Sequence, residues 1–126
     1  MSGFSNYLAN ETINSSLVTP YASRFMALFV ADPTDANVTT NEVSAGWYTR
    51  KLSGAWASPT VGATSNLSNI QWNPVTGGQI TISHWGIYDA LTSGNLLYSG
   101  AFDTTKTFNI DDFPLIAAGD IDFSLL

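Results

Sequence analysis

His84 is the only histidine in the chain, and histidine is the side chain that exchanges protons most readily near neutral pH. A hydrolytic triad would place it beside a serine nucleophile and a carboxylate, and serine is abundant in the chain. No Gly-x-Ser-x-Gly nucleophile motif occurs, however, and His84 precedes Trp85 within a run of strand character. We therefore expect a histidine packed in a sheet with one ring nitrogen hydrogen-bonded, and no catalytic residue.

The carboxylates fall in two groups along the chain, and clustered oxygen ligands of this kind can bind calcium. No EF-hand spacing is present, and the late group ends on an alternation that is typical of the solvent face of a strand. The absence of cysteine excludes a thiolate zinc site and a disulfide. We expect solvated charge, with no metal and no cofactor. The two groups are Asp32, Asp35 and Glu42, and then Asp111, Asp112, Asp120 and Asp122.

Five large aromatic residues could stack on sugars, as in a carbohydrate-binding module, or could form a core. They are Trp47, Tyr48, Trp56, Trp72 and Trp85. Most are expected in the core or an interface, because large aromatic side chains dominate burial in small β domains. The Gly77-Gly78 pair is not a phosphate loop, since no Lys-Ser/Thr follows it. The residues therefore indicate a protein that is not an enzyme.

The composition favours contacts with other proteins over contacts with nucleic acid or lipid. Of the 126 residues, 44% are hydrophobic, enough for one core, and only 11% are charged, against roughly a quarter in typical domains. Four basic and ten acidic residues give a net charge of -6, which repels nucleic acid. No apolar run approaches the roughly 18 residues of a membrane span, and no secretory signal is visible.

A central hairpin is predicted over residues 79–103, and the rest of the chain is expected to be arranged around it. Ile80 and Ile82 begin an alternation in which apolar residues occupy even-numbered positions. Trp85 and Ile87 continue it with apolar residues at odd-numbered positions. A β-bulge near Ser83-His84 would explain the switch. The polar residues 89–95 then form the turn that leads into the second strand.

The remaining pattern predicts an all-β fold with a short N-terminal helix. Helical spacing over residues 4–17 begins at a capping residue, Ser5 or Asn6, and Pro20 ends it. Residues 24–31 are apolar at both odd and even positions, which indicates a strand buried on both faces. Further strands are expected at residues 46–52, 66–72, 106–110 (with Phe108 and Ile110 inward) and 119–125. About seven strands favour an antiparallel β-sandwich or flattened β-barrel over residues 21–126, after a helix or arm over residues 1–20.

Two motifs carry a resemblance to a known family. They are ALF-x-AD-P, from Ala27 to Pro33, and GI-x-DA-x-x-x-GNLLY-x-G, from Gly86 to Gly100. With segments such as NEVSAGWYTR and AAGDIDFSL, in this order, the chain resembles small tailed-phage virion proteins labelled head decoration (cement) or tail fibre proteins. It departs from the pattern at Ser15-Ser16 and in the unusually apolar residues 52–65.

The resemblance implies a non-enzymatic structural protein of the virion, synthesised in the host cytoplasm. Small size and the lack of any shaft or repeat favour a capsid decoration protein that binds the outside of the head shell and stabilises it. The alternative is a tail-fibre or tail-tip adhesion module, including one that binds glycans. The implied partners are the major capsid protein or other virion proteins, and further copies of the chain in a trimer or dimer.

Contacts with the shell or with neighbours are expected in the segment that ends at Pro20 and in the loop over residues 52–65. Many weak contacts of this kind can add up to firm attachment by avidity. The candidate interaction residues are Phe4, Tyr7, Leu8, Ile13, Leu17, Trp56 and Val61.

Overall fold

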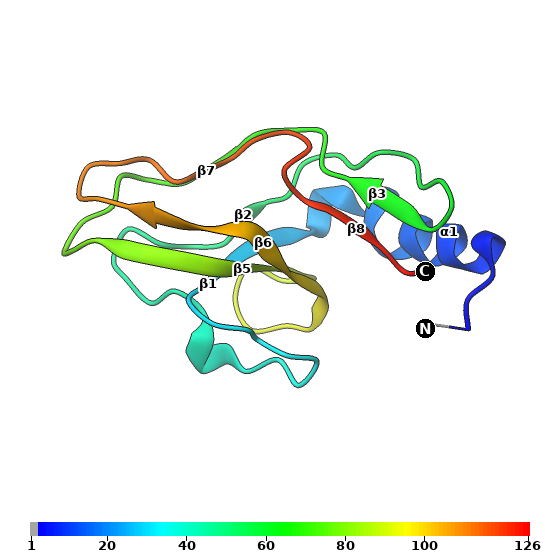
Figure 1. The fold of residues 1–126 in the computed structure, drawn as a ribbon, viewed down its shortest axis with the longest axis horizontal. Helices are drawn as coiled ribbons and strands as arrows, with labels where there is room; N and C mark the ends of the chain where they lie inside the picture. The colour runs from blue at the N-terminus through cyan, green and yellow to red at the C-terminus, as the bar shows by residue number, and fades with distance from the viewer. Residues whose placement is uncertain (1–2) are drawn as a thin grey trace.

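An antiparallel hairpin of β5 (Ile80–Tyr88) and β6 (Leu96–Phe108) runs through the centre of the computed structural model, which describes residues 3–126 (Figure 1). The register of the hairpin shifts at the predicted place. Ile82 pairs with Lys106 but His84 pairs with Ala101, so the β6 residues 102–105 lie opposite Ser83. The central hairpin and its irregularity near Ser83-His84 are thereby confirmed, with the extra residues located in the second strand.

The hairpin belongs to a four-stranded sheet in the order β2-β1-β5-β6. β1 (Phe25–Phe29) is antiparallel to β5, and its last four residues are buried, as the apolar pattern on both parities predicts. β2 (Lys51–Leu52) pairs with the other side of β1 and forms one edge of the sheet. β6 forms the opposite edge.

Two small sheets complete a second layer over one face of the main sheet. β3 (Ala63–Ser65) pairs with β8 (Asp122–Ser124), and β4 (Ile70–Gln71) pairs with β7 (Leu115–Ile116). The main core lies between the layers, where the ring of Trp85 packs near that of Phe123. The strand-rich antiparallel architecture with one short N-terminal helix agrees with the predicted fold class.

The N-terminal helix α1 (Asn6–Ile13) begins at Ser5, whose hydroxyl accepts a hydrogen bond from the backbone N–H of Leu8 at 3.1 Å. A π-helical turn, η1 (Asn14–Val18), continues it, and the 3-10 turn η2 (Tyr21–Ser23) follows Pro20. A further 3-10 turn, η3 (Thr39–Asn41), lies in the loop after β1. No helix within residues 3–126 is long and apolar enough to cross a membrane.

Three predicted strands differ from the structure in extent. Residues 46–52 contribute only β2, and residues 66–72 contribute only β4, because side-chain burial rather than a backbone ladder positions these segments. The indole of Trp72, for example, is buried and donates a hydrogen bond to the carbonyl of Thr49 at 2.7 Å. The strand expected at residues 106–110 is the end of β6, and Ile110 is exposed instead of facing inward. Asp112 accepts a hydrogen bond from the N–H of Asn109 at 2.8 Å, and this turn directs Ile110 away from the core.

Candidate functional site

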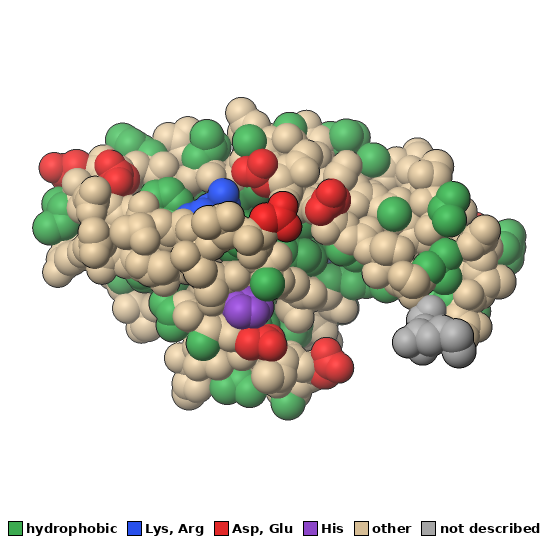
Figure 2. Space-filling model, viewed as in Figure 1, with side chains coloured by type: hydrophobic (Ala, Val, Ile, Leu, Met, Phe, Trp, Pro, Cys, Tyr) green, Lys and Arg blue, Asp and Glu red, His purple; other side chains and the backbone are tan. Residues whose placement is uncertain are grey.

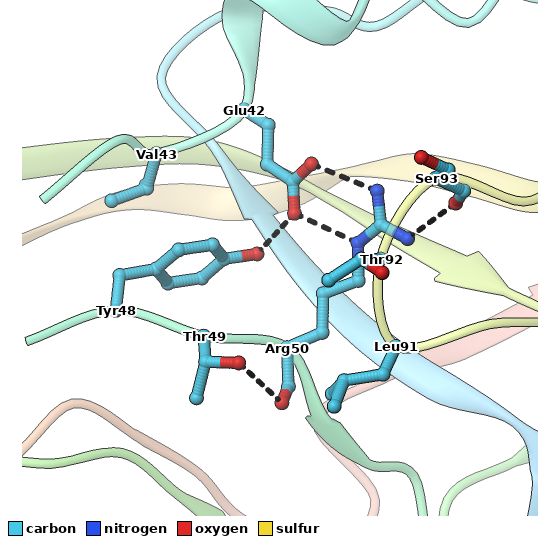
Figure 3. A pocket seen from close by; sticks show the side chains of 8 residues that line it. All are labelled: Glu42, Val43, Tyr48, Thr49, Arg50, Leu91, Thr92 and Ser93. Atoms are coloured by element: carbon cyan, nitrogen blue, oxygen red, sulfur yellow. Dashed lines mark hydrogen bonds and ion pairs between the residues drawn. The ribbon is translucent and has the colours of Figure 1, made fainter.

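A buried ion pair between Glu42 and Arg50 is the most elaborate polar site in the described part of the chain (Figure 3). The Arg50 Nε and Nη2 atoms each donate to a different carboxylate oxygen of Glu42 at 3.0 Å. Nη1 donates to the carbonyls of Ala90 at 3.0 Å and Ser93 at 2.7 Å, both in the loop between β5 and β6. Glu42 is itself held by a bridge between its backbone and the end of β1 at Phe29. We call this group of contacts the Arg50 clamp.

Two tyrosines complete the Arg50 clamp. The hydroxyl of Tyr48 donates to Glu42 Oε2 at 2.6 Å and accepts a hydrogen bond from the N–H of Leu28 at 3.1 Å. The guanidinium carbon of Arg50 lies 3.6 Å from the ring centroid of Tyr88, which is a cation–π contact. The Tyr88 hydroxyl donates to Asn37. The clamp therefore ties the loops after β1 and β5 to the main sheet.

The electrostatics of the Arg50 clamp keep its phenols neutral and its guanidinium charged. Burial, reinforced by the hydrogen bond to Glu42, raises the pKa of Tyr48 well above its usual range, and burial also raises the pKa of Tyr88. Burial acts to lower the pKa of Arg50, but the hydrogen bonds and negative charge of Glu42 outweigh it, so that pKa is raised. None of these three shifts creates a proton donor or acceptor for neutral pH, and no nucleophile takes part.

The hollow beside the Arg50 clamp measures about 270 Å³, which is below the range of about 300–1,000 Å³ typical of small-molecule sites. Within residues 3–126, every buried side-chain nitrogen and oxygen has a hydrogen-bond partner, so the clamp has no buried polar atom left for a ligand. It stabilises the loops. Sequence analysis missed it because Glu42 and Arg50 are eight residues apart in a segment without regular structure. The one available signal was that charged residues are scarce in this chain.

Of the residues first considered for chemistry, His84, Asp32 and Asp35 line one hollow, and the late carboxylates do not line it. His84 is half-buried in β5, and its Nδ1 lies 2.7 Å from the hydroxyl of the adjacent Ser83. Within the described residues, no three His, Cys, Asp or Glu side chains are grouped so that they could hold a metal ion. Several carboxylates bind neighbouring backbone instead, such as Asp120, which accepts from the N–H of Ala117 at 3.0 Å.

All four tryptophans are buried, as expected of core residues, and Tyr48 packs against the same core. Trp56, the tryptophan proposed for an interface, is only 3% exposed and donates to the Ser53 hydroxyl at 3.0 Å. Ile13 and Leu17 are fully buried as well. These three candidate interaction residues therefore serve the core in this fold and present no surface to a partner.

The other four candidate interaction residues are exposed. Tyr7 is 75% exposed and Val61 is 65% exposed, and Phe4 and Leu8 also reach the surface. They lie at the end of the molecule where α1, β3 and the C-terminus come together (Figure 1). Hydrophobic side chains are visible at this end in Figure 2. With the exposed Leu126, these residues form what we call the apolar end: Phe4, Tyr7, Leu8, Val61 and Leu126.

A tight turn at Gly62 holds the apolar end together. The N–H of Gly62 donates to the side chain of Asn10 in α1 at 2.8 Å, and its carbonyl accepts from the N–H of Leu125 at 2.9 Å. A Cβ atom at this position would come within 2.8 Å of the side chain of Leu126 and would be strained at this positive φ, so glycine is favoured there. Val61 and Gly62 have φ values of 48° and 70°, the pattern of a type I′ turn.

Residues 3–124 match the model of one protein family, which is described as podophage GP4 fiber I protein gp80. The match covers both sequence motifs, the Arg50 clamp and the apolar end except Leu126. No curated protein matches the chain significantly.

Proposed function

The chain belongs to the family of podophage GP4 fiber I protein gp80, and from this premise we propose that it is a building block of the phage tail that works by binding other virion proteins. The resemblance to small tailed-phage virion proteins is confirmed by this membership, and a virion structural protein is the role it supports. Small size and the lack of repeats favoured the head shell. The description of the family names a fibre and favours the tail alternative instead.

The family match over residues 3–124 is the observation that carries this proposal. The described residues are consistent with this role, because their most extensive polar site is a loop clamp without a nucleophile or a free buried polar atom. We therefore propose a non-enzymatic protein whose activity is attachment.

The apolar end is the surface that we propose for attachment. Tyr7 and Leu8 are exposed in the first turn of α1, and Asn10 of the same helix binds the turn that contains Val61. A β-branched residue with positive φ is strained, and asparagine or glycine would fit the first central position of a type I′ turn better. Strained backbone conformations cluster at functional sites, and the side chain of Val61 is 65% exposed, so we infer that it contacts a partner.

The test is complementation of a phage that lacks this protein, with location and copy number as readouts. Labelled wild-type protein should appear at the tail, at a handful of copies per virion. Hundreds of copies over the head would overturn the tail assignment in favour of shell decoration.

The double variant Tyr7→Ser, Leu8→Ser tests the attachment surface in the same assay. It should fold normally, because both side chains are exposed, and it should fail to enter virions. Leu91→Ser, at a similarly exposed leucine in the β5–β6 loop, is the matched control and should be incorporated normally. Normal incorporation of the double variant would remove the apolar end from the proposal.

A further inference from the structure

β6 leaves one backbone edge of the main sheet open. Within residues 3–126, its backbone forms no hydrogen bond to any segment other than β5. The pairing of β6 with β5 is regular over residues 98–101, and a register shift lies on either side of this stretch. This short stretch carries no charge and no proline, which are the usual means by which an edge strand is kept from pairing.

A groove runs along this open edge. Two adjoining hollows of about 360 and 440 Å³ share Asp35 and Ser99 and are lined by the six consecutive residues from Leu96 to Ala101. Side chains of a strand alternate between the two faces of its sheet, so a groove lined by consecutive β6 residues borders the strand edge, and its lining by His84 of the inner strand β5 shows that it also covers part of one sheet face. The groove therefore exposes the backbone of β6, together with the residues around it.

The far wall of the groove is acidic. Asp32, Thr34 and Asp35, from the loop after β1, line it together with His84. Figure 2 shows acidic side chains beside the single imidazole. Asp35 is exposed and forms no hydrogen bond in the described structure, and no lysine or arginine lines either hollow.

The chain itself lacks the cations that would complement this wall. Of its four basic residues, Arg50 is buried in the clamp and Arg24 donates to the carbonyls of Ser16 and Ser23. Lys51 is held in β2, and Lys106 lies over the ring of Phe102. A second copy carries the same net charge of -6 and has no segment with basic residues at alternate positions.

We propose that the β6 groove binds an extended segment of a partner protein that carries lysine or arginine at alternate positions. The segment would add a strand to the main sheet beside residues 98–101, a common way of recognising extended peptides. Ser99 and Ala101 share a sheet face with His84, because His84 pairs with Ala101 and Gly86 pairs with Ser99. Every second side chain of the segment reaches that face, where Asp32 and Asp35 lie.

An NMR titration of the full chain tests this inference with two peptides, acetyl-(Lys-Thr)4-amide and acetyl-(Glu-Thr)4-amide, in low salt. The lysine peptide should shift the backbone amides of residues 96–101, whereas the glutamate peptide should leave them unchanged. The variant Asp32→Asn, Asp35→Asn should raise the Kd of the lysine peptide about threefold to tenfold, the range expected for the loss of two exposed ion pairs. Asp111→Asn, in the exposed turn after β6 that contacts Val75, lines neither hollow and is the control, so it should leave the Kd unchanged.

Several outcomes would overturn the inference. They are no shift with the lysine peptide, shifts located elsewhere, equal binding of both peptides, or an unchanged Kd in the double variant. Shifts at residues 96–101 that depend on protein concentration alone would also overturn it, because a second copy would then cover the edge. Because no virion is involved, each result is independent of the tail assignment.

Discussion

Arg50 shows at the scale of one residue how this fold holds its loops. Removing its side chain would leave the Glu42 carboxylate, whose side chain is 14% exposed, without a counter-charge. We therefore expect Arg50→Ala to lower the free energy of unfolding by about 3–5 kcal/mol, as measured by urea denaturation. Lys106→Ala should lower it by about 1 kcal/mol or less, because its ammonium lies 5.4 Å from the ring centroid of Phe102 and belongs to no ion pair within residues 3–126. Equal losses in both variants would show that the Arg50 clamp is not special.

Tyr48 predicts how stability depends on alkaline pH. Because its pKa is raised in the folded chain, mainly by burial, the folded protein keeps this proton where the unfolded chain releases it near pH 10. The stability that the neutral phenol contributes is complete below pH 10 and is lost above it, by about 1.4 kcal/mol per pH unit. Tyr88 acts in the same direction. Tyr48→Phe should therefore flatten the fall in unfolding free energy above pH 10 by one proton, and an unchanged slope would contradict this account.

At the scale of an element, the turn at Val61 allows strain and function to be separated. Asparagine tolerates positive φ far better than valine does, so Val61→Asn should stabilise the protein by about 1 kcal/mol and raise Tm by several degrees. The same substitution removes an exposed apolar side chain from the apolar end and should reduce incorporation into virions. Thermal unfolding and copy counting measure the two effects. A variant that is less stable, or one that is incorporated normally, would contradict the prediction.

Elements whose apolar pattern is unambiguous were predictable from the sequence. The parity switch between Ile82 and Trp85 located the irregularity of the central hairpin, and the two-sided apolar run located β1. Residues 46–52 and 66–72 were not predictable in extent. In residues 66–72 the alternation reflects which side chains are buried, and in residues 46–52 the buried side chains of Trp47 and Arg50 are three positions apart. A buried side chain does not require its backbone to join a sheet.

The candidate site was predictable only in part, for a related reason. The spacing of Phe4, Leu8, Ile13 and Leu17 indicates a helix with an apolar face, but no spacing tells which apolar residues that face buries. Contacts between distant segments are likewise absent from local patterns. Arg50 reaches carbonyls 40 and 43 residues further along the chain, and nothing in the loop of Ala90 and Ser93 indicates this partner.

At the scale of the whole molecule, scarce charge goes together with surfaces left open at two places, the apolar end and the β6 groove. The apolar end exposes hydrophobic side chains, whereas the β6 groove combines an open strand edge with an acidic wall. The two surfaces therefore suit different partners. A structural subunit needs at least two such surfaces to link its neighbours, and these two do not overlap in any residue.

The unity of the molecule can be tested by deleting residues 1–20. The proposed division at residue 20 treats this segment as a helix or arm beside a separate domain. Ile13 and Leu17, however, are fully buried, and Leu17 belongs to the main core. Burial of each such side chain contributes about 1.5–3 kcal/mol, against a total stability of about 5–15 kcal/mol for a domain, and the backbone contacts of α1 would be lost too.

We therefore expect the deletion to unfold or strongly destabilise the chain, as seen by circular dichroism and thermal unfolding. A cooperative transition within a few degrees of the full chain would instead establish residues 21–126 as an independent domain, and the deletion could then be used to test attachment directly.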